Sequence, residues 1–92
     1  MKEEEKISKA VALKYESGID FAPKVIAKGR GIIADIIKKI AIEKDIPIYE
    51  DKELVDILEK IEIDYEIPEI LYDVVAEILA FAYKINKMRK KL

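Results

Sequence analysis

The chain offers few side chains that could carry out chemistry. Its 92 residues contain no cysteine and no histidine, which excludes thiolate and imidazole metal sites and the Ser/His and Cys/His catalytic arrangements. Two neighbouring carboxylate pairs, Glu50/Asp51 and Asp64/Glu66, could bind Mg²⁺ or exchange protons. In a chain with 19 acidic residues such neighbours arise by chance. We therefore expect solvated carboxylates, no metal, no cofactor and no enzyme activity.

Two further features could bind anions. Gly29 and Gly31 precede an isoleucine-rich segment, and the N–H groups that open a helix can cradle a phosphate. The pattern lacks both the P-loop Gly-Lys-Ser/Thr and the third glycine of a dinucleotide fingerprint, so a tight strand-to-helix turn is favoured. The basic residues between positions 84 and 91 could touch nucleic acid or a membrane surface. Cations also suit a helix C-terminus, and no aromatic interleaving supports nucleic-acid binding.

Periodicity predicts the strands that would position these residues. Val11, Leu13 and Tyr15 alternate along one face, which predicts a strand over residues 10–15. A Ser-Gly turn follows, and residues 23–28 form a second short strand that opens with Pro23. Residues 46–49, Ile-Pro-Ile-Tyr, are expected to form a third.

Three helices complete the expected architecture. The first has an inward isoleucine stripe and ends at Asp45, the second begins at Asp51 as its N-cap, and the last starts with Pro68 in its first turn. The inward residues are expected to be Ile32, Ile33, Ile36, Ile37 and Ile40 in the first helix, Leu54, Val55, Leu58 and Ile61 in the second, and Ile70, Leu71, Val74, Val75, Ile78, Leu79, Ala82 and Ile85 in the last. A strand, helix and strand at this spacing predict a right-handed parallel βαβ unit. The predicted fold class is α/β, with a small mixed sheet of three to four strands flanked by three helices.

Composition agrees with one soluble domain. Hydrophobic residues make up 51% of the chain and charged residues 39%, with a net charge of −2. That balance does not describe a general polyanion binder. The charged N-terminus lacks the apolar core of a signal peptide, and no apolar run approaches the roughly 20 residues that span a bilayer. A cytoplasmic location without a membrane span is expected.

Four segments, in order along the chain, carry a resemblance to one protein family. They are residues 10–15 (Ala-Val-Ala-Leu-Lys-Tyr), 22–31 (Ala-Pro-Lys-Val-Ile-Ala-Lys-Gly-Arg-Gly), 46–48 (Ile-Pro-Ile) and 66–80, which opens Glu-Ile-Pro-Glu-Ile-Leu-Tyr. Together they resemble the C-terminal cytoplasmic domain of the FlhB/YscU family, the export-switch proteins of flagellar and type III secretion systems. The resemblance implies a charged segment over residues 1–8 and an FlhB C-terminal-like cytoplasmic domain over residues 9–92.

The chain departs from the family at its cleavage motif. Members carry Asn-Pro-Thr-His before the first matching strand and cut themselves between Asn and Pro, whereas Glu5, Lys6, Ile7 and Ser8 align there. Glu5 has no amide nitrogen to attack its own carbonyl, so autocleavage is not expected. We expect no counterpart of the family's transmembrane region or of the strand before the cleavage site. We therefore expect a stand-alone paralogue whose first strand offers an open edge to a truncated or cleaved membrane-anchored FlhB.

The resemblance also implies a binding site. Family members use the residues that match Ala22, Pro23, Ala76 and Leu79 as a shallow apolar pocket for a short motif in early export substrates. Small residues beside one leucine would leave a concavity for an apolar side chain, although Ala76 and Leu79 alone would also fit ordinary helix packing.

The implied function is a binding module beside the export gate that recognises export substrates, contributes to specificity switching and binds export-apparatus membrane proteins. The alternative is a small nucleic-acid-associated or regulatory α/β domain, with only the basic tail and the loop containing Lys28 and Arg30 in its support.

Overall fold

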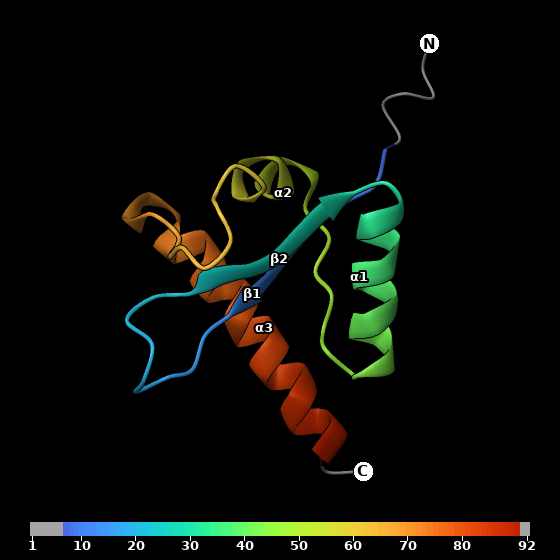
Figure 1. The fold of residues 1–92 in the computed structure, drawn as a ribbon. Coiled ribbons are helices and arrows are strands. Elements are labelled where there is room, and N and C mark those ends of the chain that lie inside the picture. The colour runs from blue at the N-terminus through green and yellow to red at the C-terminus, as the bar shows by residue number, and fades with distance from the viewer. Residues whose placement is uncertain (1–6, 91–92) are drawn as a thin grey trace.

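The computed structural model describes residues 7–90, and its fold is α/β with three helices. Figure 1 shows a short hairpin that α3 crosses, with α1 beside it and α2 near its upper end. This confirms the expected class and the number of helices. In chain order the elements are β1 (Lys9–Lys14), β2 (Lys24–Arg30), α1 (Ile32–Glu43), α2 (Lys52–Leu58), the short 3₁₀ helix η2 (Glu69–Leu71) and α3 (Tyr72–Lys90).

The sheet is smaller than expected and contains no parallel pair. Within residues 7–90 it consists of β1 and β2 alone, paired antiparallel as a hairpin, so the mixed sheet of three to four strands and the βαβ unit are wrong. Residues 46–50 form no ladder; Tyr49 instead packs its ring edge-on against Phe81 of α3, with centroids 5.5 Å apart. Pro47 cannot donate to a ladder. The outer edge of β2 is already met by residues 64–67, which bond to Pro23 and Val25.

The two faces of the hairpin differ in side-chain size, and this decides which helix lies on each. On one face, Val11 and Leu13 pack against the buried core cluster, while Lys9 reaches α2. Alternation places Ala10 and Ala12 on the other face, opposite Gly29 and Ala27 of β2. That face of small residues lets α1 approach closely.

The core lies between the hairpin, α2 and α3. Its buried residues come from α2, the connector before η2, η2 and α3: Leu54, Leu58, Ile67, Leu71 and Val75. Val75 and Val25 are completely buried. Ile70, expected to be buried, is 88% exposed, and Val74 is also partly exposed. The 3₁₀ turn at η2 rotates Ile70 away from the face that Leu71 and Val75 share.

The isoleucines of α1 are the largest departure from the expected core. Ala34 is the buried residue of this helix, whereas Ile32, Ile33, Ile36 and Ile40 are all exposed, Ile32 by 76%. A two-stranded sheet is too narrow to cover a wide apolar stripe. The helix therefore buries Ala34 and touches β2 through Ile33 at Gly29, while much of its isoleucine surface stays exposed.

The expected boundaries of the first helix and the expected start of the second are confirmed, whereas the second ends at Leu58, before Ile61. The last α-helix begins at Tyr72 and not at Pro68, because a 3₁₀ turn comes between them. Gly31 precedes α1 with a φ of 59°, a left-handed conformation that favours glycine. After Glu43 the chain turns at Asp45, which has a φ of 58°, and the Ile46 N–H donates to the Ala41 carbonyl. Asp51 caps α2, since its Oδ1 accepts the Leu54 N–H at 3.0 Å.

Candidate functional site

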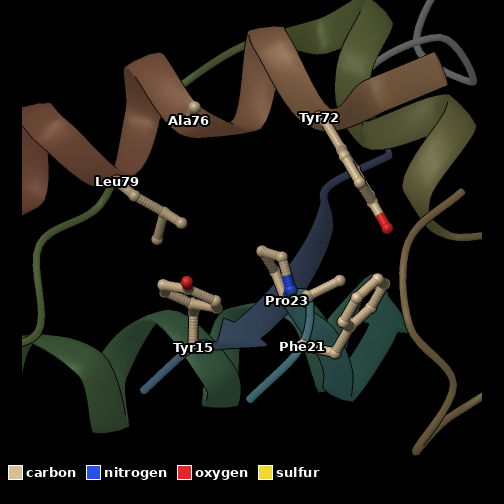
Figure 2. Close-up of a pocket in the computed structure, with 7 residues that line it drawn as sticks. Tyr15, Phe21, Pro23, Tyr72, Ala76 and Leu79 are labelled. Carbon is tan, nitrogen blue, oxygen red and sulfur yellow. The ribbon is translucent and has the colours of Figure 1, made fainter. Parts of the chain in front are cut away.

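A single apolar pocket gathers all four residues for which a binding role is expected. It encloses about 220 Å³ between the hairpin loop and the first turns of α3. Figure 2 shows Tyr15, Phe21 and Pro23 facing Tyr72, Ala76 and Leu79 across this space. Its lining consists of Tyr15, Phe21, Ala22, Pro23, Tyr72, Ala76 and Leu79.

Ala22 and Pro23 contribute the hairpin side of the pocket immediately before β2. Ala22 is only 1% exposed and Pro23 is buried. The Pro23 carbonyl accepts the Ile67 N–H at 2.8 Å, and the Val25 N–H donates to the Tyr65 carbonyl at 3.0 Å. Because the segment before η2 is fastened to this point, the backbone on the hairpin side is fixed relative to the start of α3.

Ala76 and Leu79 form the opposite wall from one face of α3, three residues apart. Leu71 and Val75 are buried in the core and hold this end of the helix in place. Ala76 itself is exposed and Leu79 is half-buried. Ala76 thus has no part in the core, and its methyl group leaves the space that a larger residue would fill.

Three aromatic lining residues were not anticipated from the sequence. Tyr15 follows β1, Phe21 lies in the hairpin loop, and Tyr72 begins α3 one turn before Ala76. A helical i, i+4 relation to Ala76 could have indicated Tyr72, and the alternation of Val11 and Leu13 could have indicated the side on which Tyr15 lies. Nothing comparable points to Phe21, whose position depends on the loop.

The pocket is suited to reversible binding of an apolar side chain. None of its seven lining residues carries a charge. The polar atoms its side chains offer are the phenol hydroxyls of Tyr15 and Tyr72. Apolar walls with a few polar groups at the rim are typical of sites that bind by burial and orient by hydrogen bonding.

A network of charged groups lies apart from the pocket lining, on the side of the hairpin that faces α2. Lys9 donates to Asp56 at 2.7 Å and lies 3.2 Å from Glu59, which also accepts two hydrogen bonds from Arg30 at 2.9 and 3.0 Å. The bonds from Arg30 and then Lys9 lower the pKa of Glu59 to about 2. Next to them, the Lys28 ammonium donates to the carbonyls of Glu59 and Ile61, both at 2.8 Å. This network fastens the end of α2 to the hairpin.

The alternative sites considered from sequence gain no support from the geometry. Within residues 7–90, no group of three or more acidic side chains is placed to hold a metal ion. Gly29 lies inside β2, and Gly31 forms the turn between β2 and α1, as the strand-to-helix turn interpretation expects. Lys84 and Lys87 are exposed on α3, while Lys91 lies outside the described residues. In the part of the chain that the structure describes, no helix has the length and hydropathy to cross a bilayer.

Sequence comparison matches residues 7–82 to the model of the FlhB HrpN YscU SpaS family. The uncharacterized protein YlqH of Bacillus subtilis (strain 168) is 48% identical over 90 residues, which are 98% of this chain and 97% of that protein. The flagellar biosynthetic protein FlhB of the same organism is 43% identical over 79 residues, or 85% of this chain. The chain spans only 22% of the length of that FlhB.

Structural comparison finds further domains that resemble this chain. The cytoplasmic domain of FlhB from Shewanella putrefaciens superposes with a TM-score of 0.82 at 35% identity, covering 91% of this chain and 66% of that one. A mutated EscU C-terminal domain superposes with a TM-score of 0.80 at 34% identity, covering 83% of this chain and 93% of that one.

Proposed function

The chain belongs to the FlhB HrpN YscU SpaS family, and from that premise we propose that it is a non-catalytic binding module of the flagellar or type III protein export apparatus. In this role it recognises export substrates and contributes to substrate-specificity switching. The relatives it matches include flagellar FlhB proteins and an EscU domain, so the proposal covers both kinds of export system.

The observation that carries this proposal is the apolar pocket. Ala22, Pro23, Ala76 and Leu79 come from two segments more than 50 positions apart and line one space of about 220 Å³. Ala76 is exposed, so folding alone does not require an apolar residue there. A peptide that inserts one apolar side chain would cover the walls and bind reversibly, with weak affinity because little area is buried.

We further propose that the module substitutes for the cleaved cytoplasmic domain of a membrane-anchored FlhB. The outer edge of β1 supports this, because within residues 7–90 only β2 pairs with β1. Such an edge can accept a strand from a truncated or cleaved FlhB. Lys9 and Lys14 bound the edge and would limit unspecific pairing. Residues 1–6, including Glu5 at the aligned cleavage position, lie outside the described residues.

The test of substrate recognition is a charge placed in the pocket. Ala76→Glu should abolish binding of peptides tiled from the N-terminal regions of flagellar export substrates, because insertion would leave a carboxylate against an apolar side chain at a cost of about 1–3 kcal/mol. Binding is measured by titration of ¹⁵N-labelled protein, with Ala80→Glu as the control. Ala80 is also exposed on α3 but does not line the pocket.

Loss of binding in Ala76→Glu together with retention in Ala80→Glu would support the proposal. Equal binding by wild type and a folded Ala76→Glu variant would show that substrates are recognised elsewhere or not at all.

A further inference from the structure

The hairpin loop that leads into the pocket carries an aromatic side chain that the fold does not use. Phe21 is 83% exposed, although an aromatic ring is among the largest apolar surfaces a protein can bury. It is nevertheless a lining residue of the pocket, at the end bounded by Tyr72. A large apolar side chain that stays outside the core but borders a cavity is available to a ligand.

The loop that carries Phe21 is held in one conformation by its own hydrogen bonds. The Asp20 carboxylate accepts the Glu16 N–H at 2.7 Å and lies 3.3 Å from the Lys14 ammonium. The Ile19 and Asp20 N–H groups both donate to the Glu16 carbonyl. Gly18 turns the chain with a φ of 86°. Phe21, next to Asp20, is therefore presented at the pocket before any ligand arrives, which lowers the ordering cost of binding.

Tyr15 and Tyr72 complete this side of the pocket. Tyr15 is 41% exposed and faces Leu79, while Tyr72 is half-buried and lies near Phe21. Ala22, Pro23 and Ala76 form the small-residue part of the lining. Aromatic rings thus make up three of the seven lining residues, and a small ligand side chain would leave much of their surface uncovered.

We infer that Phe21, supported by Tyr15 and Tyr72, is the specificity-determining wall of this pocket and selects peptides that insert a large aliphatic or aromatic side chain over a small one. The inference rests on the proposed peptide-binding function and deepens it. Phe21 covers the inserted side chain, and Asp20 acts as a positioning residue that holds the loop.

The experiment uses N-acetyl-phenylalaninamide, N-acetyl-leucinamide and N-acetyl-alaninamide as probes, titrated up to about 20 mM because ligands of this size bind weakly. Wild type should bind the Phe and Leu probes at least about tenfold more tightly than the Ala probe. Phe21→Ala should lower the affinity for the Phe probe by about tenfold. This is the loss expected when about 55 Å² of apolar area is no longer covered in the complex.

Ile19→Ala is the matched control. Ile19 lies in the same loop and is 72% exposed, but it does not line the pocket, so this variant should bind as wild type does. Both variants should keep the wild-type melting temperature, since neither side chain is buried. Asp20→Ala should lower the affinity for the Phe probe and also broaden the amide signals of the loop. Loss of apolar contact area alone would not broaden those signals.

The outcomes separate this inference from the proposed function. If Phe21→Ala binds the Phe probe as tightly as wild type, or no probe shifts the pocket amides, the assignment of Phe21 is overturned. If export-substrate peptides bind wild type but not Ala76→Glu, the proposed function would still stand in that case. If the amino acid amides bind through Phe21 but no export-substrate peptide binds, the assignment holds and the proposed function fails.

Discussion

The close packing of α1 on the hairpin makes Gly29→Ala the most informative stability test. A Cβ atom at Gly29 would lie 2.7 Å from Ile33 Cβ and closer still to Ile33 Cγ2. Carbon atoms pack at about 3.5–4.0 Å, so α1 and β2 would have to separate by about 1 Å. Cβ is fixed to the helix backbone and cannot rotate away. Gly29 has no positive φ, so the effect is steric alone.

The expected cost is about 2–3 kcal/mol, the upper part of the range for overpacked cores. In a domain of this size each 1 kcal/mol lowers the melting temperature by about 4–8 °C, so we expect a decrease of about 10–20 °C. Differential scanning calorimetry gives the melting temperature, and urea unfolding gives the free energy of unfolding. Circular dichroism should show unchanged helix content in the variant at low temperature.

A double-mutant cycle with Ile33→Gly isolates the contact. That substitution removes both clashing atoms at a cost of about 0.5 kcal/mol in helix propensity. Gly29→Ala should then be nearly neutral, giving a coupling energy of about 2 kcal/mol. If Gly29→Ala costs the same in both backgrounds, or costs nothing in the wild type, the close contact between β2 and α1 does not exist as described.

Two further predictions concern the network that fastens α2 to the hairpin. Because the pKa of Glu59 falls from 4.5 unfolded to about 2 folded, its stabilising effect is present above pH 4.5 and is lost as the pH falls towards 2. The stability difference between wild type and Glu59→Gln in urea unfolding should therefore shrink over that window; a constant difference would contradict the ion pairs. Lys28→Met should cost about 1.5–3 kcal/mol by leaving the Glu59 and Ile61 carbonyls without their charged donor. Hydrogen exchange should be faster at the end of α2 than in wild type, and an unchanged rate there would argue against the Lys28 contact.

Local signals in the sequence predicted much of the fold. The alternation of Val11 and Leu13 located β1, and Asp51 located the start of α2, because a strand period and a cap are properties of a few neighbouring residues. The family resemblance selected Ala22 and Ala76, which the structure brings together in one pocket.

Features that depend on the whole fold were not predictable in this way. Residues 46–49 have a strand-like composition, yet Tyr49 finds its partner in Phe81 on α3. The isoleucines of α1 have the period of a buried face, but a face can be buried only if enough sheet exists to cover it. The hydrogen bonds that present Phe21 are local to its loop, but the pocket that Phe21 lines exists only once α3 lies opposite that loop.

The uneven anchoring of α3 implies a gradient of local unfolding along the helix. Leu71, just before α3, and Val75 in its first turn are buried, whereas Tyr83, Lys84, Lys87 and Met88 are exposed near its end. The final turns can therefore open at little cost in buried apolar area, and opening that starts from that end must separate Leu79 and Ile78 from the core before it reaches Ala76. We therefore expect the amides around Ala76 to exchange more slowly than those of the final described turns, so that opening of those turns leaves the pocket in place.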